Sequence, residues 1–382
     1  MSGSVDKKTG CRVTYIWLSG RDSHHDIRSK DRTMYLTDEE LKKHPKDLLA
    51  EGFFPLWNFD GSSTNQAHGA DTEIILKPVN AYHCCLPRPT TTVPRILVLA
   101  ECHLPSGEPT RDNSRAMARL IFEQKPNEHP WFGMEQEFFL MKDGRPYGWP
   151  ATGFPAPQGP YYCATGFPFA PGRKYIDLHY EICLQMGLNV SGTNAEVAPG
   201  QWEFQVGPCE GLEMGDQLTV ARWVLLRILE DEGLDVEYRA KPIQGDWNGS
   251  GLHTNFSTQA TRSENGLDVI YNYVERLKQT VRKDIIFYGP ENNERLTGKH
   301  ETSVPNVVTA GVGTRKTSIR IPNSVANDRK GYMEDRRPAG DADPYLVSSR
   351  LFASCLSLDT PALDLVSPLH EKGWMNFPVV QS

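Results

Sequence analysis

The chain has 382 residues, and this length exceeds one compact core of usual size, so two domains are expected. With 38% hydrophobic and 23% charged residues, the composition excludes a disordered or fibrous protein. The formal net charge of −7 argues against a nucleic-acid partner, because phosphate backbones attract basic surfaces.

The first hundred residues are predicted to form short strands joined by turns. Each run of β-branched and aliphatic residues is bounded by Gly, Pro or Asp, which is typical of strands between tight turns. The clearest strands are expected at residues 12–18, 73–79 and 95–102.

Residues 112–124 differ, because they begin with Asp-Asn-Ser, carry apolar residues at helical spacing and end near Pro126. A helix is predicted here, and the domain boundary is placed at about residue 108. The two expected domains are residues 1–108 and 109–382.

Strands and helices alternate after this boundary. A stretch rich in Gly, Pro and aromatic residues, 143–172, is interpreted as a packed loop. Apolar residues recur at helical spacing in several segments, two of which end at a Gly. The expected helices are 174–186, 216–232, 267–287 and 345–358, and the expected strands are 134–141, 202–207, 251–257 and 317–322.

An acidic pair, Glu135 and Glu137, lies inside the otherwise apolar run 131-WFGMEQEFFLM-141. In a strand, residues two apart point the same way, so these carboxylates would lie roughly 7 Å apart on one face. Two like charges on an enclosed face need a cation, and without one such acids repel each other and take up protons.

Three other predicted strands also carry polar residues on one face. For a single strand, an ordinary solvated face is the alternative interpretation. Flanking residues such as Trp202 and Phe204 favour a polar face enclosed inside a funnel. Oxygen ligands with one imidazole and no thiolate favour Mg²⁺ or Mn²⁺ over Zn²⁺. The residues that share faces are Gln201, Glu203 and Gln205; His253 and Asn255; and Tyr332, Glu334 and Arg336.

Arginines are concentrated in the last third of the chain. A guanidinium grips phosphate or carboxylate oxygens in pairs, and near bound metals it neutralises a transferring phosphoryl group. For Arg336 and Arg337, the alternative interpretation is an ordinary charged face in contact with solvent. No Walker A sequence and no G-x-G-x-x-G before a helix is present, so a P-loop ATPase, a protein kinase and a Rossmann dehydrogenase fit poorly. The arginines are Arg295, Arg315, Arg320, Arg336 and Arg337.

On these residues, the chain resembles the glutamine synthetase family in its short eukaryotic (type II) form, from about residue 12 to 358. The motifs that carry the resemblance are 57-WNFDGSST-64, 130-PWFGMEQEFFL-140, 158-QGPYYC-163, 193-TNAEVAPGQWEFQVGPCEG-211, 246-DWNGSGLHTNFST-258, 295-RLTGKHETS-303 and 331-GYMEDRRP-338.

The resemblance implies an α+β fold, with an N-terminal β-grasp domain and a catalytic domain in which helices surround an antiparallel β funnel. It implies a homo-oligomer, a decamer of two pentameric rings with active sites between subunits. The implied reaction is ATP-dependent ligation of ammonia to the side-chain carboxylate of L-glutamate. It proceeds through γ-glutamyl phosphate and gives L-glutamine, ADP and phosphate.

The resemblance also implies residue roles. Asp60 would take a proton from ammonium across a subunit boundary, and Glu301 would lie on a loop that closes over the intermediate; an ordinary Asp-Gly turn is the alternative for Asp60. Arg315, Arg320 and Arg337 would stabilise the transferring phosphoryl group. Two or three Mg²⁺ or Mn²⁺ ions are implied per site, one held by Glu137, Glu196 and Glu203 and another by Glu135, His253 and Glu334. Glutamate would contact Trp247, Asn248, Gly249, Arg295 and Arg336, and the nucleotide Trp131, Glu203, Asn255, Ser257, Arg262, Arg320 and Tyr332.

Three segments depart from the family pattern: 42–56, 81–89 and the lid segment 302–316. Two alternatives therefore stay open, an ATP-dependent γ-glutamyl ligase for a larger amine and a non-catalytic structural relative. Neither alternative has a reason to keep both Asp60 and Glu301, so the presence of these two residues argues against both alternatives.

The sequence also bears on location. No apolar run approaches the roughly 18 to 20 residues of a membrane helix, so no membrane association is expected. The start MSGSVDKKTG lacks the apolar core of a signal peptide. Eight cysteines show no C-x-x-C spacing, which argues against a thiolate zinc site and favours free thiols. We expect a cytoplasmic protein.

Overall fold

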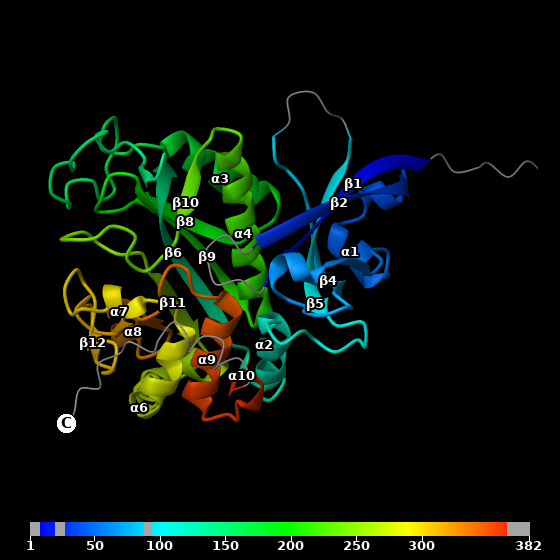
Figure 1. The fold of residues 1–382 in the computed structure, drawn as a ribbon. Coiled ribbons are helices and arrows are strands. Elements are labelled where there is room, and N and C mark those ends of the chain that lie inside the picture. The colour runs from blue at the N-terminus through cyan, green and yellow to red at the C-terminus, as the bar shows by residue number, and fades with distance from the viewer. Residues whose placement is uncertain (1–7, 20–26, 88–92, 365–382) are drawn as a thin grey trace, which may run out of the picture. The chain divides into compact units, whose positions relative to one another are not determined.

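The computed structural model describes residues 8–19, 27–87 and 93–364. The residues before position 8, part of the start searched for a signal peptide, and residues 88 and 89 of the departing segment 81–89 lie outside this description. The chain divides into two compact units, residues 1–116 with 181–188 and residues 117–180 with 189–382. Both helices and sheets are present, which confirms the mixed class (Figure 1).

The first unit contains a five-stranded sheet in the order β2-β1-β5-β4-β3. Neighbouring strands are antiparallel except β1 and β5, which are parallel. Side chains such as Tyr15, Trp17 and Val98 form its buried core. The elements are β1 (Lys8–Leu18), β2 (Ile27–Thr37), α1 (Pro45–Ala50), β3 (Trp57–Asp60), β4 (Glu73–His83) and β5 (Arg95–His103), with short 3₁₀ helices at Glu40–Lys42 and Gly61–Thr64.

The three strands predicted in this unit are present as β1, β4 and β5, whereas β2 and β3 were not predicted. β2 is an edge strand whose residues are mostly exposed or half-buried. An exposed edge strand needs no apolar alternation, so its sequence lacks the signal on which the prediction relied.

The second unit contains a nine-stranded sheet in the order β12-β13-β14-β11-β6-β9-β8, with β7 and β10 also paired to β6. Neighbouring strands are antiparallel except β12 and β13, which are parallel. The strands are β6 (Trp131–Lys142), β7 (Arg145–Pro146), β8 (Val190–Ala195), β9 (Gln201–Glu210), β10 (Asp235–Glu237), β11 (Leu252–Ser257), β12 (Ala310–Val312), β13 (Ile319–Ile321) and β14 (Met333–Asp335).

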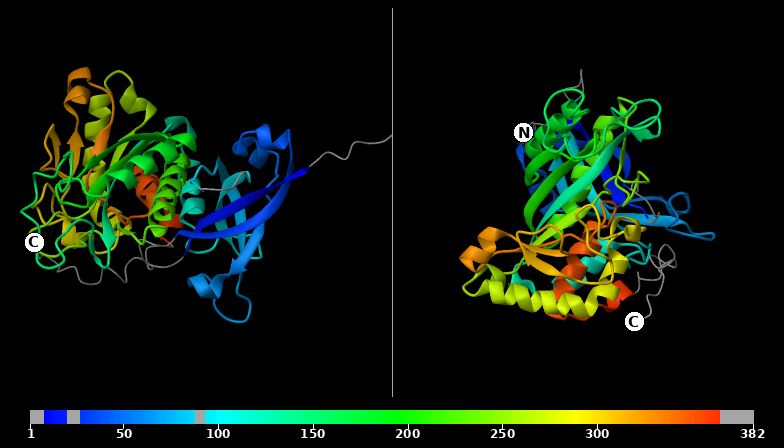
Figure 2. Two further views of the ribbon diagram at one scale, coloured as in Figure 1. Left: turned by 90° about the horizontal axis from the view of Figure 1, so that it is seen from above. Right: turned by 90° about the vertical axis from the view of Figure 1, so that its left-hand side faces the viewer.

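The five predicted helices are all present, and they are the five longest helices among the described residues. In the second unit, α4 packs against β6, β9 and α9, and α6 packs against α9 (Figure 2). These five are α2 (Ser114–Phe122), α3 (Arg173–Gln185), α4 (Leu212–Glu230), α6 (Gly266–Asp284) and α9 (Pro344–Leu356). Shorter helices are α5 (Gln259–Arg262), α7 (Asn292–Arg295), α8 (Asn323–Asp328) and α10 (Pro361–Asp364), with 3₁₀ turns at Pro126–Glu128 and Ile285–Phe287.

Helix α4 begins at Leu212, four residues before the predicted start at residue 216. The prediction treated Asp216 as a helix start, but its carboxylate accepts a hydrogen bond from the Tyr345 hydroxyl at 2.7 Å inside the core. Gly215 is inside the helix because a Cβ there would lie 2.3 Å from the Tyr345 ring. The close approach of Tyr345 therefore explains why a glycine stands at this position.

The segment 143–172 is largely turns and bends, with only the short β7, as the loop prediction stated. Among the residues that the structure describes, no helix combines the length and apolar character needed to cross a lipid bilayer.

Candidate active site

The register of neighbouring strands brings the acids of the second unit together. β6 pairs with β11 so that Glu135 lies opposite His253, and with β9 so that Glu137 lies opposite Glu203. Opposed residues in antiparallel strands have Cβ atoms about 4.5–5.5 Å apart. The pairing of β14 with β11 adds Glu334 to the same region.

Side chains in β6 alternate as predicted. Met134, Gln136 and Phe138 are buried on one face, whereas Glu135 and Glu137 are half-buried on the other. The buried face packs into the core, and because side chains alternate along a strand, this packing fixes the direction of both carboxylates.

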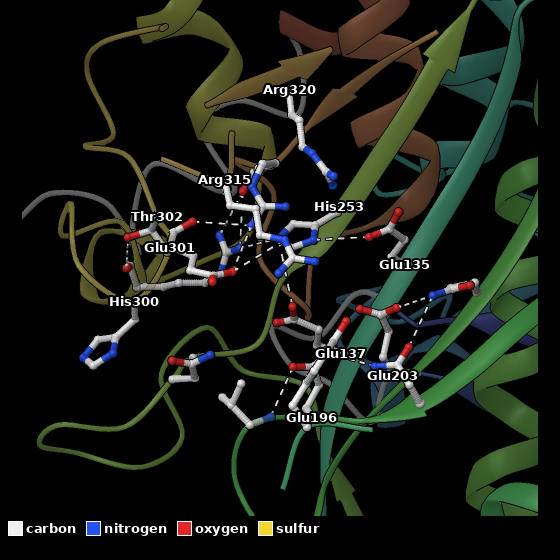
Figure 3. Close-up of a pocket in the computed structure, with 18 residues that line it drawn as sticks. Glu135, Glu137, Glu196, Glu203, His253, His300, Glu301, Thr302, Arg315 and Arg320 are labelled. Carbon is white, nitrogen blue, oxygen red and sulfur yellow. Dashed lines mark hydrogen bonds and ion pairs between the residues drawn. The ribbon is translucent and has the colours of Figure 1, made fainter. Parts of the chain in front are cut away.

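The six carboxylate and imidazole residues form two groups, and Figure 3 shows five of them, all but Glu334. The first acidic cluster, Glu135, His253 and Glu334, and the second acidic cluster, Glu137, Glu196 and Glu203, each offer ligand atoms within 4.8 Å of one another. Five carboxylates and one imidazole are a suitable donor set for a hard divalent cation, as the sequence argument anticipated.

The protonation of these groups supports cation binding. Burial, followed by neighbouring carboxylates, raises the pKa of both Glu196 and Glu203 well above the ordinary range of a glutamate. Burial and the Arg336 guanidinium lower the pKa of His253 to about 4. His253 is therefore neutral, which is the form of imidazole that binds metal.

Backbone and side-chain donors orient the carboxylates. Glu137 Oε2 accepts a hydrogen bond from the Gly251 amide at 2.6 Å, and Glu135 Oε1 accepts one from Asn255 Nδ2 at 2.8 Å. Glycine at position 251 also leaves space for the Arg295 guanidinium, since a Cβ there would lie 2.3 Å from it. The orientation of the acids is thus set before any ligand binds.

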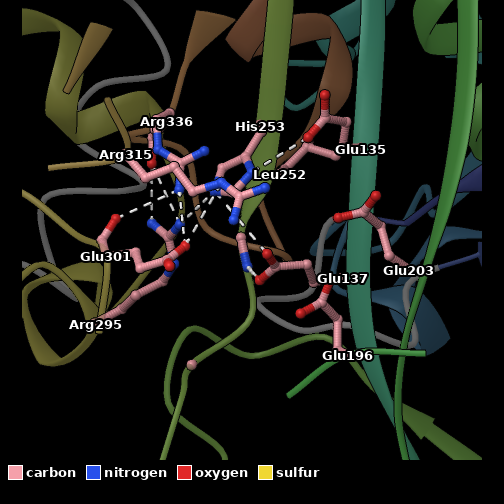
Figure 4. Close-up of polar contacts among 12 residues, drawn as sticks. Glu135, Glu137, Glu196, Glu203, Leu252, His253, Arg295, Glu301, Arg315 and Arg336 are labelled. Carbon is pink, nitrogen blue, oxygen red and sulfur yellow. Dashed lines mark hydrogen bonds and ion pairs between the residues drawn. The ribbon is translucent and has the colours of Figure 1, made fainter. Parts of the chain in front are cut away.

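A cavity of about 380 Å³ is lined by His253, four of the five carboxylates of the two clusters and four arginines. Figure 4 shows three of these arginines, Arg295, Arg315 and Arg336, beside the acids. Arg336 Nη1 donates to Glu334 at 2.5 Å, and Arg320 Nη1 donates to the other oxygen of Glu334 at 3.2 Å. Positive groups therefore face the acids across the cavity. The lining includes Glu135, Glu137, Glu196, Glu203, Asn248, Gly249, His253, Arg295, Glu301, Arg315, Arg320 and Arg336.

Arg337 does not line this cavity. Its side chain is fully buried and donates to Asp335 at 2.9 and 2.6 Å, with Asp284 at 3.9 Å and the Tyr288 hydroxyl at 3.4 Å. The alternation that turns Glu334 toward the first acidic cluster and Arg336 into the cavity turns Asp335 and Arg337 to the opposite side of the chain. The structure therefore does not bring Arg337 to the place expected for a phosphoryl contact.

Glu301 lies at the cavity mouth, with its carboxylate 3.9 Å from Arg315 Nε and 4.0 Å from Arg336 Nη2. The φ angles of His300 and Glu301 are 52° and 59°. This left-handed conformation is unfavourable for residues with a Cβ, and such strain tends to occur at functional loops.

The residues expected to bind glutamate lie close together, with one exception in placement. Asn248, Gly249, Arg295 and Arg336 line the cavity, whereas Trp247 is buried against Trp149, with ring centroids 4.7 Å apart. Trp247 lines a neighbouring cavity of about 710 Å³ that shares Arg295 and Gly249 with the first.

Three of the residues expected to bind the nucleotide base lie together, namely Trp131, Ser257 and Arg262. The Arg262 guanidinium lies 4.0 Å from the centre of the Trp131 ring and donates to Ser257 Oγ at 2.8 Å. Tyr332 is 42% exposed, so it is not a core residue. Of this predicted set, Glu203 and Arg320 are among the described residues of the cavity wall, whereas Trp131, Asn255, Ser257, Arg262 and Tyr332 are not.

Asp60 belongs to the first unit, at the end of β3. Its carboxylate accepts hydrogen bonds from the Ser62 amide and hydroxyl at 3.1 and 2.8 Å and from the Ser63 hydroxyl at 3.0 Å. These donors, Ser62 first, lower the pKa of Asp60 to about 2. The residue is therefore a fixed, exposed carboxylate that caps the turn after the strand.

Several residues that line the cavity or contact its lining received no role from the sequence. Gln158 accepts from the Asn248 amide at 2.7 Å and donates to its side chain at 2.8 Å, and His300 Nε2 lies 3.0 Å from Asp246. All of these residues lie within the motifs quoted above. Their position next to the acids of those motifs was therefore the signal by which they could have been found. Those lining the cavity are Tyr162, Asn194, Val197, Gln205, His300 and Thr302.

Comparison with known proteins matches residues 109–357 to a family model described as "Glutamine synthetase, catalytic domain". A protein from Neurospora crassa named glutamine synthetase is 47% identical, over 89% of this chain and 90% of its own length. The human protein of that name is 46% identical over 91% of each chain, and the Fusarium solani one is 46% identical over 92% and 95%.

Proposed function

Because the chain belongs to the glutamine synthetase family and makes glutamine from glutamate and ammonia with ATP, we propose that it does so in the cavity between its two acidic clusters. The observation that carries this proposal is the meeting of five of the six cluster residues with four arginines in one cavity, where Arg320 and Arg336 also donate to the sixth residue, Glu334. Phosphoryl transfer requires this combination of anionic cation ligands and cationic phosphate ligands.

Mg²⁺ or Mn²⁺ bound by the clusters would polarise the phosphate oxygens of ATP and neutralise their charge. The protein supplies the ligands, Glu135, His253 and Glu334 on one side and Glu137, Glu196 and Glu203 on the other. Its arginines act by position and charge, because a loose phosphoryl transition state offers little covalent chemistry to assist.

We assign Arg315 and Arg320 to the transferring phosphoryl group, since both line the cavity beside the acids. Arg295, with its side chain buried next to His253, and Arg336 are assigned to the carboxylate and charge of glutamate, together with Asn248 and Gly249. Arg337 is assigned to the core behind β14 rather than to the phosphoryl group.

Glu301 is proposed to close the cavity over γ-glutamyl phosphate and to exclude water. Replacing Glu301 by Ala is expected to keep nucleotide binding while phosphate is released without equal glutamine formation, because water then reaches the acyl phosphate. The measurement is a phosphate-release assay with ATP, Mg²⁺ and glutamate, run with ammonium, with methylamine and with no amine, alongside glutamine quantification.

The same assay on the unmodified protein tests the function itself. Release that depends on glutamate and ammonium, matched by glutamine, is the expected result. Methylamine turnover exceeding ammonium turnover would favour a ligase for larger amines, and no release with any amine would favour a non-catalytic relative. Equal glutamine and phosphate from the Glu301→Ala protein would contradict the lid assignment alone.

Asp60 is proposed to serve the ammonium subsite of a neighbouring subunit. Its low pKa keeps it ionised at neutral pH, which suits attraction of the ammonium cation better than efficient removal of its proton. The Asp60→Ala protein is expected to need roughly 10- to 100-fold more ammonium for half-maximal rate, with a much smaller change for glutamate, because general acid–base and electrostatic contributions are of this order or larger. Steady-state rates at varied ammonium and varied glutamate measure this, and equal changes for both substrates would remove the assignment.

The metal-free protein should become less stable as pH rises. Burial first, and then neighbouring acids, raise the pKa of Glu196 to about 8 and of Glu203 to about 9, so the folded state holds protons that the unfolded state releases above its ordinary glutamate pKa. The favourable contribution is fully present below the ordinary pKa and is lost as pH rises through the folded values. The unfolding temperature without metal is expected to fall between pH 6 and 9, and saturating Mg²⁺ should reduce this slope. A pH-independent difference between the two conditions would contradict it.

A homo-oligomer, a decamer of two pentameric rings with sites shared between subunits, is the proposed assembly. Exposed aromatic side chains support self-association, since large apolar residues at the surface mark interaction faces. Phe154, Phe167 and Phe169 in the loop 143–172 are 66%, 89% and 45% exposed.

A cytoplasmic location and the domain division 1–108 and 109–382 are also proposed. All eight cysteines are free thiols, which supports a reducing compartment. The family match begins at residue 109, and the mixed five-stranded sheet of the first unit supports a β-grasp domain before it.

A further inference from the structure

Two amide side chains, Asn194 and Gln205, lie between two carboxylates of the second acidic cluster. Asn194 Nδ2 donates to Glu196 Oε1 at 2.9 Å, and Gln205 Nε2 donates to Glu203 Oε1 at 2.5 Å. Gln205 Nε2 also donates to Asn194 Oδ1 at 3.4 Å. The four side chains thus form one hydrogen-bonded chain, and both amides line the cavity.

The local backbone is shaped for this arrangement. β8 and β9 pair so that Asn194 lies opposite Glu203 and Gly192 lies opposite Gln205, after a register shift between Val190 and Gly192. A Cβ at Gly192 would lie 2.4 Å from Gln205 Oε1. Glycine at this position therefore leaves the space in which the Gln205 amide turns toward Glu203.

Each amide binds one oxygen of its carboxylate, so the second oxygen can face a cation. In Glu196 this second oxygen also accepts a longer hydrogen bond from the Val197 amide at 3.3 Å, which further fixes its direction. Glu196 and Glu203 are 7% and 6% exposed, so water cannot easily replace these donors. A carboxylate whose rotation is fixed loses less conformational freedom on binding a cation, and such supporting residues typically change metal affinity 10- to 100-fold.

We propose that Asn194 and Gln205 are positioning residues that hold Glu196 and Glu203 in the geometry of the second acidic cluster, and that Gly192 is the position that makes this possible. The inference rests on the proposed metal site. It concerns Asn194 and Gln205, which themselves are not cation ligands in this proposal.

The test is Mn²⁺ binding to the full chain, measured by the paramagnetic signal of free Mn²⁺ in titrations without substrates. Gln205→Met keeps the length of the side chain and removes the donor, and Asn194→Leu does the same for the other amide. Each is expected to weaken one class of Mn²⁺ site 10- to 100-fold and to leave the other class near its original affinity.

Gly192→Ala provides a variant that touches neither carboxylate. It is expected to weaken the same class of site by displacing Gln205. Combined with Gln205→Met, it should add little further loss, because both changes remove one interaction. Ser191→Ala, on the same strand, is the matched control. The exposed Ser191 hydroxyl donates to the main-chain carbonyl of Gln205 at 3.4 Å rather than to its side-chain amide, so this variant is expected to bind Mn²⁺ normally.

Thermal unfolding separates positioning from a general loss of stability. Without metal, the Gln205→Met and Asn194→Leu proteins should unfold near the wild-type temperature, whereas the added stability from Mn²⁺ should shrink with the lost affinity. Wild-type affinity in both amide variants, or a loss of metal-free stability that accounts for the whole effect, would overturn the inference. Absence of Mn²⁺ binding to the wild-type protein would instead overturn the proposed metal site.

Discussion

The Glu137→Ala protein is expected to lose about 1,000-fold in kcat/KM for glutamine synthesis. Glu137 is central among the acids: it lies opposite Glu203 in the sheet, and its Oε1 is 4.0 Å from His253 Nε2 of the first acidic cluster. Electrostatic stabilisation by a bound metal contributes several kcal/mol to such reactions, and each 1.36 kcal/mol corresponds to tenfold in rate. Initial rates of glutamine formation across Mg²⁺ concentrations are the measurement.

Glu275→Ala is the matched control for this loss of rate. Glu275 is an acid on α6 whose side chain is 64% exposed and paired with Lys278 at 2.7 Å, so its removal is expected to change neither rate nor metal requirement. A Glu137→Ala protein that keeps more than about a tenth of the wild-type rate at every Mg²⁺ concentration would contradict the assignment of the cavity to metal-assisted chemistry.

Arg337→Ala is expected to destabilise the fold by about 3–5 kcal/mol, the range measured when one partner of a buried ion pair is removed. Arg337, Asp335 and Asp284 all have fully buried side chains, and Arg350 donates to Asp284 at 2.8 Å on the far side. Without Arg337, Asp335 keeps only neutral donors such as Tyr288 at 3.1 Å. Denaturant unfolding of the metal-free protein measures the effect.

The neighbouring arginine makes this prediction sharp. Arg336→Ala removes a cavity-facing cation while Glu334 keeps Arg320 at 3.2 Å, so stability should fall less and turnover more. Removing Asp335 together with Arg337 should recover part of the lost stability, because no unpaired buried charge then remains. If Arg337→Ala instead unfolds like the wild type and loses turnover, Arg337 acts on the phosphoryl group after all.

Arg336 and Arg337 show what the alternation of side chains along a strand predicts and what it does not. The spacing of 334-EDRRP-338 predicted that residues 334 and 336 share a face, and Glu334 and Arg336 do contact each other. The same period places residue 337 on the other face. Family resemblance grouped Arg337 with the phosphate ligands, but the sequence contains no information on which face of β14 packs against Asp284 of α6.

Helix predictions were reliable for a different reason. An amphipathic helix needs one apolar stripe, and this pattern lies within one segment of sequence. The predicted start of α4 was wrong because Gly215 and Asp216 both contact Tyr345, which lies about 130 residues away in sequence. The edge strand β2 was missed because most of its side chains are exposed or half-buried, so its sequence shows no alternation of apolar and polar residues.

The amino-acid sequence by itself determined which acids share a face, because side-chain direction alternates along any strand, and it determined the family through its motifs. Only the tertiary structure decided that Glu135 lies opposite His253, that Glu137 lies opposite Glu203, and that Asn194 and Gln205 join two carboxylates. Strand register is set by hydrogen bonds and packing between segments distant in sequence, and the distances that allow acids to share a cation depend on that register.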